Sequence, residues 1–191
     1  MSILLTILVY LSQIIFDVVI FILLLRIFLQ IFKANNNNQI SQFVAQYTNP
    51  IVNPLAKILP KMGLFDLSAI IIVFIVEILK FTTIGFIANN VIYPLLPMII
   101  FALRDLILYV LNFFFYAIII RVILSWFNPT LRNAITAILY TVTEPMLNLF
   151  KRFVPKTSTI DLSPFAALVL LQLLFLIISS VGISINAGGG V

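Results

Sequence analysis

The sequence predicts an all-α membrane protein in which four transmembrane helices form two parallel tandem repeats, each with a bent amphipathic helical insert. Three observations predict this fold. The 191 residues are 63% hydrophobic and only 9% charged, whereas a soluble domain carries about 25% charged residues. A helix needs about 20 apolar residues to cross a bilayer, and four stretches of the sequence are long enough. The chain also matches itself at an offset of 95 residues. This composition excludes a soluble enzyme, a disordered chain and a secreted disulfide-stabilised domain.

The four predicted spans cover residues of about 3–32, 67–88, 97–127 and 162–185. The first span lacks the basic start and the cleavage site of a signal peptide, and its apolar part is about twice the usual length, so we expect it to be retained. The third span contains Arg104-Asp105 near its start. We interpret these two residues as a local charge pair near the outer face of the membrane.

An amphipathic segment lies between the two spans of each half, at 39–59 and at 130–154. Its apolar residues follow the i, i+3, i+4, i+7 spacing of a helix. Thr48-Asn49-Pro50 interrupts the first segment and Thr143-Glu144-Pro145 the second. A capping side chain followed by proline is typical of a helix start. The pattern therefore predicts two short helices in each insert, bent at these prolines and lying in the membrane interface. The prolines expected to stop the inserts are Pro60 and Pro155.

Lysine and arginine are concentrated in the two segments that join the spans of each half. Nine of the eleven lie there: Arg26, Lys33, Lys57, Lys61, Arg121, Arg132, Lys151, Arg152 and Lys156. Cytoplasmic loops of membrane proteins carry an excess of such residues. The distribution therefore predicts that both inserts face the cytoplasm and that both termini lie outside.

The two halves, 1–95 and 96–191, align at the 95-residue offset without a gap. Many of the identical positions are polar or proline, so shared hydrophobicity does not explain the match. They include Arg26 with Arg121, Asn38 with Asn133, Thr48 with Thr143, Pro50 with Pro145, Asn53 with Asn148, Pro60 with Pro155, and Asp66 with Asp161. Because each half has two spans, both copies enter the membrane in the same direction.

These motifs resemble the YggT family (also called YlmG), small integral membrane proteins of bacteria and plastids. The resemblance rests on residues 25–29 and 48–54 in the first half, and on 120–129, which includes Trp126, and 143–147 in the second. It implies a bacterial inner-membrane location. It also implies loosely defined roles: maturation of cytochrome b6 haem in plastid relatives, nucleoid distribution and division in others, and osmotic tolerance in bacterial ones. It supplies no catalytic motif.

The chain has no Cys and no His. Thiolate nucleophiles, zinc and iron–sulfur sites and the usual haem ligands are therefore ruled out. We expect no cofactor, no metal site and no enzymatic activity, and any haem-linked role would be indirect. Basic runs with interleaved polar residues are also missing, so no nucleic-acid contact is implied.

Three alternatives exist for Arg26 and Arg121, which lie near the predicted cytoplasmic edge. Their side chains could snorkel to the interface, cap carbonyls or a carboxylate of the bent insert, or bind lipid phosphate. We interpret the Thr-x-Pro motifs as structural and expect Trp126 to lie at an interface. The asparagines expected to hydrogen-bond nearby backbone or each other are Asn53 and Asn148. The residues expected to cap the second and fourth spans are Asp66 and Asp161.

Ionisable residues inside predicted spans form a candidate polar layer. Asp17, Glu77 and Lys80 lie in the first half, and the equivalent positions in the second half are Asn112 and Gln172. At about 1.5 Å per helical residue, Asp17 and Glu77 share a depth near the midplane. The layer is either a buried hydrogen-bonded set that fixes helix register or a proton or cation site.

We therefore expect a non-enzymatic inner-membrane protein that acts as an assembly or organising factor through its cytoplasmic-face amphipathic helices. Its expected partners are the lipid bilayer, including anionic lipids, and an unidentified membrane protein. The alternative is a small ion or osmolyte transporter or channel, linked to osmotic tolerance, that uses the layer of Asp17, Glu77 and Lys80. Four spans leave little room for a pore unless the chain forms a homo-oligomer, which the sequence leaves open.

Overall fold

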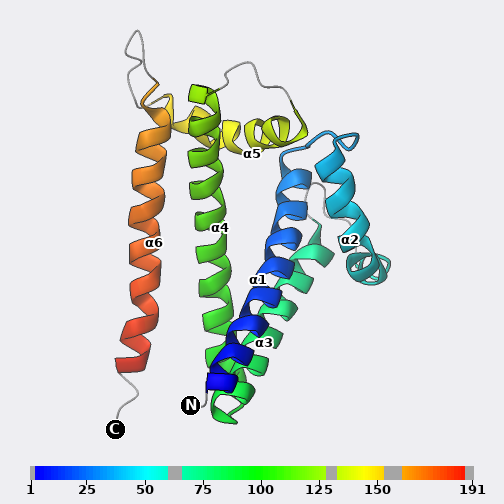
Figure 1. Ribbon diagram of the computed structural model, residues 1–191, viewed down its shortest axis with the longest axis vertical. Coiled ribbons are helices and arrows are strands. Elements are labelled where there is room, and N and C mark those ends of the chain that lie inside the picture. The colour runs from blue at the N-terminus through cyan, green and yellow to red at the C-terminus, as the bar shows by residue number, and fades with distance from the viewer. Residues whose placement is uncertain (1–2, 60–65, 128–132, 153–160, 188–191) are drawn as a thin grey trace. The chain divides into compact units, whose positions relative to one another are not determined.

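The computed structural model describes residues 3–59, 66–127, 133–152 and 161–187. Within these ranges every regular element is a helix, which confirms the all-α prediction for the described residues (Figure 1). The helices are α1 (Ile3–Ile31), α2 (Gln39–Ala56), α3 (Leu67–Asn89), α4 (Leu95–Phe127), α5 (Ala134–Phe150) and α6 (Ser163–Ala187). Some residues of the sequence argument lie outside the described ranges: Pro60, Lys61, Pro129, Arg132, Pro155 and Lys156.

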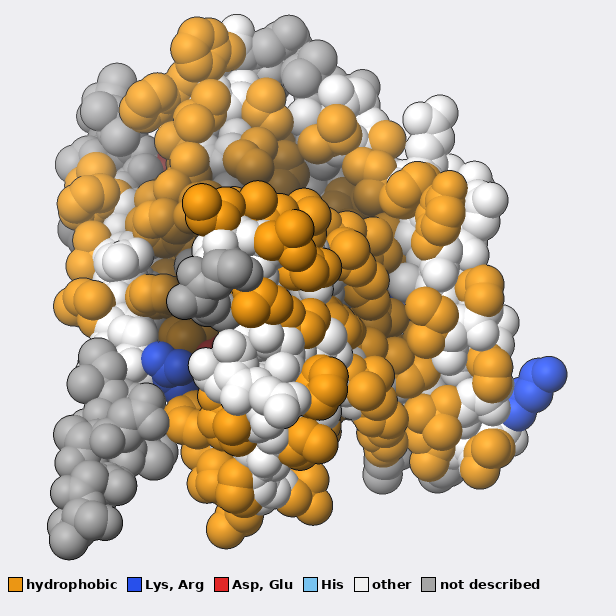
Figure 2. Space-filling view, turned by 60° about the horizontal axis from the view of Figure 1, so that its bottom comes forward, with side chains coloured by type: hydrophobic (Ala, Val, Ile, Leu, Met, Phe, Trp, Pro, Cys, Tyr) orange, Lys and Arg blue, Asp and Glu red, His pale blue; other side chains and the backbone are white. Residues whose placement is uncertain are grey.

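Four of these helices are long and apolar enough to cross a membrane: α1, α3, α4 and the Ser163–Ser180 part of α6. Their ends agree with the predicted spans to within a few residues. Large hydrophobic side chains on them face outward, and Figure 2 shows such side chains over most of one face of the molecule. A surface this apolar is unfavourable in water and suits lipid. The chain is therefore a multi-pass membrane protein by helix length and composition.

Contacts divide the chain into two compact units. Unit 1 comprises Met1–Ile31 and Gln42–Leu106, and unit 2 comprises Phe32–Ser41 and Ile107–Val191. The sequence halves differ from these units in two segments, 32–41 and 96–106. The start of α4 stays with unit 1 because a short turn joins it to α3.

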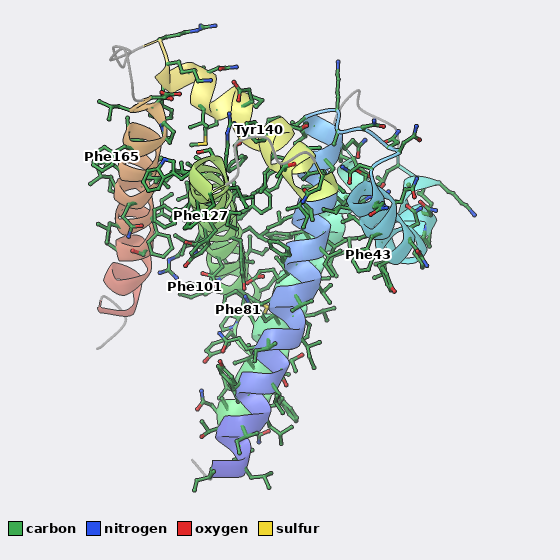
Figure 3. All side chains as sticks on the ribbon, turned by 45° about the horizontal axis from the view of Figure 1, so that its top comes forward. Phe43, Phe81, Phe101, Phe127, Tyr140 and Phe165 are labelled. Atoms are coloured by element: carbon green, nitrogen blue, oxygen red, sulfur yellow. The ribbon has the colours of Figure 1, made fainter. Side chains whose placement is uncertain are left out.

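Side chains on α3 and the start of α4 touch within unit 1. The rings of Phe81 and Phe101 have centroids 6.4 Å apart (Figure 3). The Thr82 hydroxyl lies 3.5 Å from the sulfur of Met98. These contacts continue the hairpin that the short turn begins.

The turn between α3 and α4 depends on two residues with special backbone requirements. Asn90 has a φ of 53°, in the left-handed region that Asn tolerates better than most residues. Its N–H bonds to the carbonyl of Phe86, and the N–H of Val91 bonds to that of Gly85. A Cβ atom at Gly85 would lie 2.9 Å from the Val91 carbonyl oxygen and 2.8 Å from the Tyr93 ring. Glycine is therefore needed there for close approach of the chain.

In unit 1, α1 and α3 pack side by side, and α2 lies beside the C-terminal end of α1 (Figure 1). The interior is formed by buried aliphatic residues of all three helices, with small residues at the start of α3 that let backbones approach closely. Its members include Ile20, Leu23 and Ile27 of α1, Val44 and Val52 of α2, and Ser68, Ala69 and Ile72 of α3.

In unit 2, α5 lies across the ends of α4 and α6 (Figure 1). A small core joins the three helices through Ile118, Leu147, Ala167 and Leu171. Asn133 and Thr136 form a capping box at the start of α5: each side chain accepts the other's backbone N–H, at 2.8 and 3.0 Å. Oδ1 of Asn38, which precedes α2, accepts the N–H of Ile40 at 2.9 Å.

The structure corrects the prediction of two short helices in each insert. Instead, α2 runs unbroken through Pro50 and Pro54, and α5 runs unbroken through Pro145. Proline inside a helix usually costs about 3 kcal/mol, because it removes one N–H and its ring crowds the preceding turn. Side chains of other helices hold the two residues just before Pro50 and just before Pro145, and these tertiary contacts favour a continuous helix.

Candidate functional sites

Arg26, close to the C-terminal end of α1, connects three segments of unit 1. Its Nη1 donates to Oγ1 of Thr48 at 2.7 Å and to Oδ1 of Asn49 at 2.7 Å. Its Nε donates to Oδ2 of Asp66 at 3.3 Å. The other oxygen of Asp66 accepts the N–H of Ala69 at 3.2 Å, so Asp66 caps α3 as predicted. One guanidinium thus ties α1 to the middle of α2 and to the start of α3.

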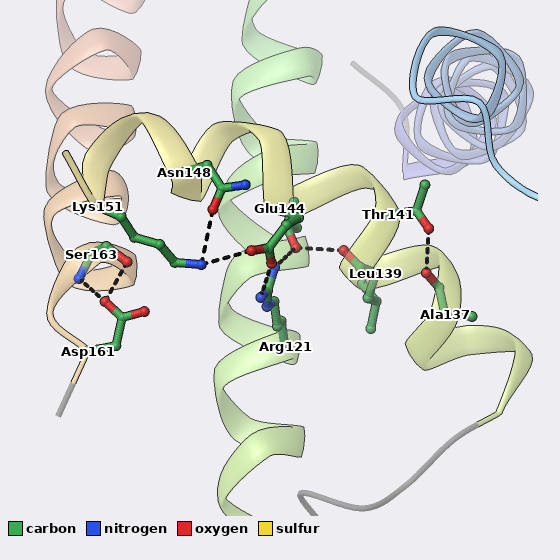
Figure 4. A network of polar contacts seen from close by, with 10 residues as sticks. Arg121, Ala137, Leu139, Thr141, Glu144, Asn148, Lys151, Asp161 and Ser163 are labelled. Atoms are coloured by element: carbon green, nitrogen blue, oxygen red, sulfur yellow. Dashed lines mark hydrogen bonds and ion pairs between the residues drawn. The ribbon is translucent and has the colours of Figure 1, made fainter. Parts of the chain in front are cut away.

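Arg121 makes the corresponding contacts in unit 2 (Figure 4). Its Nη1 donates to Oγ1 of Thr143 at 2.8 Å, and its Nη2 donates to Oε2 of Glu144. Oε1 of Glu144 accepts from Nζ of Lys151 at 2.8 Å, and Lys151 also donates to Oδ1 of Asn148 at 3.1 Å. The guanidinium carbon lies 4.2 Å from the ring centroid of Tyr140, a cation–π distance. This network fixes α5 to the end of α4.

The two cations beside Glu144 determine its ionisation. Burial by itself would raise the pKa of Glu144. Hydrogen bonds from Lys151 and Arg121, together with their positive charges, outweigh burial and lower the pKa of Glu144 below its ordinary value. The carboxylate is therefore the stable form of Glu144 in this network.

The two arginine contacts share the same spacing. Thr48 follows Arg26 by 22 residues, and Thr143 follows Arg121 by 22 residues. In both helices the threonine hydroxyl donates onward to the carbonyl four residues back, at 2.6 Å. Of snorkelling, contact with the bent insert and binding of lipid phosphate, the structure shows contact with the insert for both arginines. The partners are side-chain oxygens, and Asn49 and Glu144 are partners that the sequence argument did not identify.

The other residues of the repeat motif lie on the surface or at helix starts. Pro50, Pro145, Asn53 and Asn148 are exposed, and Trp126 is 79% exposed near the end of α4. Oδ1 of Asp161 accepts the N–H of Ser163 at 2.9 Å, which caps the start of α6. Oδ1 of Asn148 accepts from Nζ of Lys151, which is a side chain and not the backbone partner expected. The structural role of the motif stays a prediction.

A second site lies inside the membrane-spanning part of unit 1, around Nζ of Lys80. This atom lies 2.5 Å from Oε1 of Glu77, 3.6 Å from Oδ1 of Asp17 and 4.0 Å from Oδ2 of Asp105. Asp105 also pairs with Arg104 at 3.3 Å. The five residues come from α1, α3 and α4, and we call them the charge cluster. Side chains of Lys80 and Glu77 are 5% and 0% exposed.

The charge cluster contains three of the five residues predicted for the polar layer. The structure brings Asp17, Glu77 and Lys80 together. Asn112 and Gln172 belong to unit 2, where Asn112 is partly buried and Gln172 is exposed. Within their unit, these two amides therefore form no buried layer.

Asp105 joins the cluster, although the sequence argument paired it with Arg104 alone. A signal for this contact exists in the sequence. Lys80 and Asp105 are almost the same number of residues from the middle of the turn between α3 and α4. In a hairpin of two helices, such positions lie at the same height along the pair. Among the described residues, no group of acidic side chains has the arrangement of a metal site.

Comparison with known proteins gives a consistent picture. The CCB3/YggT family model matches residues 5–87 and 100–181. An uncharacterized protein of Pseudomonas aeruginosa is 34% identical over 174 residues, covering 89% of this chain and 87% of its own length. YggT of Escherichia coli K12 is 29% identical over 154 residues, covering 80% and 79%. The chloroplastic YlmG homolog protein 2 of Arabidopsis thaliana is 37% identical over 62 residues, covering 32% and 24%. No solved structure matches the chain.

Proposed function

The chain belongs to the CCB3/YggT family, and from this premise we propose that it is a non-enzymatic organising factor of the bacterial inner membrane. In this proposal, α2 and α5 are held at the cytoplasmic face and present surfaces to a membrane-protein partner and to anionic lipids. The single observation that carries the proposal is the paired attachment of both inserts to spans through Arg26 and Arg121. A fixed insert is suited to presenting a defined surface, because its binding face needs no ordering when a partner arrives.

The attachment has the same form twice, which supports a tandem repeat. Arg26 and Arg121 reach threonines at equal spacing, and the helix after each contact contains proline two residues beyond the threonine. The family model also matches two separate segments of the chain. We therefore propose that 1–95 and 96–191 are parallel copies, each made of two spans and one insert.

The distribution of cations supports the cytoplasmic placement. Exposed Lys57 and Lys33 flank α2, and Arg152 follows α5. The turn between α3 and α4, at 90–94, carries no Lys or Arg. By the positive-inside rule, the inserts then face the cytoplasm and this turn faces outward.

The α2 surface best suited to a partner is an apolar stripe. Phe43, Tyr47 and Ile51 are 52%, 57% and 50% exposed and recur every four residues on one side of the helix. The rings of Phe43 and Tyr47 have centroids 4.6 Å apart. Neighbouring Val44 and Thr48 are buried against the spans. The inner side of α2 is thus anchored, while its aromatic side is available to a partner's apolar surface.

Photo-crosslinking in native membranes tests this surface. A photoreactive amino acid at Tyr47 is expected to give one protein adduct of fixed mass, and the same adduct is expected from position 51. The matched control is Gln42, which is exposed on the same helix and points well away from Tyr47. Equal adducts from Gln42, or only lipid adducts from Tyr47, would count against an organising role for this stripe.

A second candidate function is ion or osmolyte transport, and the observation that favours it is the charge cluster. Its residues bring opposite charges together inside helices of membrane-spanning length. Intramembrane ionisable groups often mark ion pathways. Flux into liposomes that contain the purified protein tests this candidate. Flux that Asp17→Asn and Glu77→Gln abolish would favour transport, and no flux above that of empty liposomes would reject it.

A further inference from the structure

We propose that Glu77 is a proton-binding site, and that the charge cluster holds one exchangeable proton on its carboxyl group. This inference goes beyond the organising role and does not depend on it. It also does not require transport, since a buried acid can bind and release a proton without moving it across a membrane. It rests on the charge balance of the cluster, on the burial of Glu77 and on an oxygen that has no partner.

The charge balance of the cluster is uneven. Asp17, Glu77 and Asp105 supply three negative charges when ionised, whereas Lys80 and Arg104 supply two positive charges. Asp17, Lys80 and Asp105 lie around Glu77 from the three helices α1, α3 and α4, and Arg104 pairs with Asp105. Net charge is costly in an apolar environment because little solvent is present to stabilise it. One bound proton makes the five side chains neutral in sum.

Glu77 is the member of the cluster best placed to hold that proton. Its side chain is 0% exposed, whereas those of Asp17 and Asp105 are 39% and 26% exposed. The protein encloses Asp17 and Asp105 only in part, and Arg104 also pairs with Asp105. Glu77 is thus the most completely buried acid of the cluster, and burial disfavours its ionised form most.

The contacts of Glu77 are also asymmetric. Oε1 lies 2.5 Å from Nζ of Lys80. Oε2 is buried and has no hydrogen-bond partner among the described residues. A buried anionic oxygen without a donor is strongly destabilising, whereas a neutral carboxyl group carries its proton on that oxygen. In the neutral form, Oε1 still lies beside Nζ of Lys80, and Lys80 keeps its attraction to Asp17 and Asp105.

Proton exchange at this site needs no other reactant than water. On release, the Oε2–H bond breaks and the proton passes to a water molecule. Glu77 then becomes a carboxylate paired with Lys80, and the cluster gains one negative charge. Rebinding reverses both changes. A buried carboxyl group can bind either a proton or a small metal cation. We favour a proton because the described acids do not form a metal-binding group.

Infrared difference spectroscopy tests the proposal, since a protonated carboxyl group has a C=O stretching band that a carboxylate lacks. The chain contains only two glutamates, Glu77 and Glu144. We would label glutamate with ¹³C at the side-chain carboxyl carbon and record pH difference spectra of the full-length protein in lipid nanodiscs. The expected result in the Glu144→Gln background is one labelled carboxylic-acid band that disappears reversibly as pH rises.

Matched variants assign this band. Glu77→Gln is isosteric with the neutral acid and keeps an oxygen for Lys80, so it is expected to fold and to lose the labelled band entirely. Asp17→Asn removes an equal charge from the same cluster and is expected to retain a glutamate band. Three outcomes would overturn the proposal: no labelled acid band at any pH, a band that persists in folded Glu77→Gln, or a band abolished by sodium or potassium at constant pH. The first needs no variant of Glu77 and so stands even if Glu77→Gln fails to fold. This test measures no flux. Its result is therefore independent of whether the protein transports ions or osmolytes.

Discussion

Nη1 of Arg26 lies 2.7 Å from Oγ1 of Thr48, so the end of a long apolar helix is joined to the middle of α2. The hydroxyl of Thr48 donates in turn to the carbonyl of Val44 at 2.6 Å. Arg121 repeats this chain of contacts with Thr143 and Leu139. The arginines therefore attach the inserts to the spans.

Replacing Arg26 by lysine is expected to loosen α2. Lysine keeps the positive charge but lacks the planar fork that reaches Thr48, Asn49 and Asp66 together. Loss of these part-buried hydrogen bonds is expected to cost roughly 1–3 kcal/mol. Hydrogen exchange in 42–56 should become faster, while exchange in α6 stays unchanged. Lys57→Met, at an exposed position beside α2, is the matched control and should leave exchange as in the unaltered protein.

The network of Glu144 predicts a pH dependence of stability. Because the pKa of Glu144 is lower in the folded protein than in the unfolded chain, ionised Glu144 stabilises the fold. This contribution is complete above the ordinary pKa of glutamate, about 4.3, and is lost as pH falls through the lower folded value. Thermal unfolding in detergent checks this prediction. Glu144→Gln should be less stable than the unaltered protein at neutral pH, and the difference should shrink in acid. A difference that is independent of pH would contradict the ionic role of Glu144.

Gly85→Ala is expected to destabilise the hairpin of α3 and α4. The added methyl group would lie 2.9 Å from the carbonyl oxygen of Val91, which is main chain and cannot rotate away. Overpacking of this kind costs about 1–3 kcal/mol. The control is Asn90→Gly, which keeps the left-handed conformation at a φ of 53° and should be close to neutral. Both variants can be compared by their midpoint of thermal unfolding in the same detergent.

The charge cluster predicts strong coupling between Lys80 and Glu77. Lys80→Met leaves the cluster acids without the ammonium group, and breaking a buried pair in this way costs about 3–5 kcal/mol. The double variant Lys80→Met with Glu77→Gln should recover part of this loss, because it also removes the carboxyl group that Nζ of Lys80 contacts. A double-mutant cycle of unfolding free energies measures the coupling. Additive effects of the two changes would show that the pair does not interact.

Much of the fold is predictable because lipid imposes a simple length rule. The predicted spans at 3–32 and 67–88 differ from α1 and α3 by single residues at their ends, since the bilayer selects uninterrupted apolar helices. The starts of the insert helices are also set by residues close to them in the sequence. Asn38 and Asn133 can be recognised from sequence because an N-cap acts on the next three residues.

Contacts between distant residues account for the features that cannot be predicted from the sequence. Pro50 indicates a break, but Arg26 holds Thr48 and Asn49 from another helix and the helix continues. Local propensity carries no information about such a partner. For the same reason the sequence pairs Asp105 only with its neighbour Arg104, and its approach to Lys80 becomes visible only when α3 and α4 are placed in a hairpin.

Labelling of single cysteines in intact cells is the most direct test of the central claim, that both inserts lie on the same, cytoplasmic side of the membrane. The chain has no Cys, so Gln42→Cys in α2, Ala137→Cys in α5 and Val91→Cys in the turn after α3 each give one reactive thiol at an exposed position. A membrane-impermeant maleimide is predicted to label position 91 from outside and to label 42 and 137 only after the membrane is opened. Labelling of 42 and 137 from opposite sides would contradict the claim.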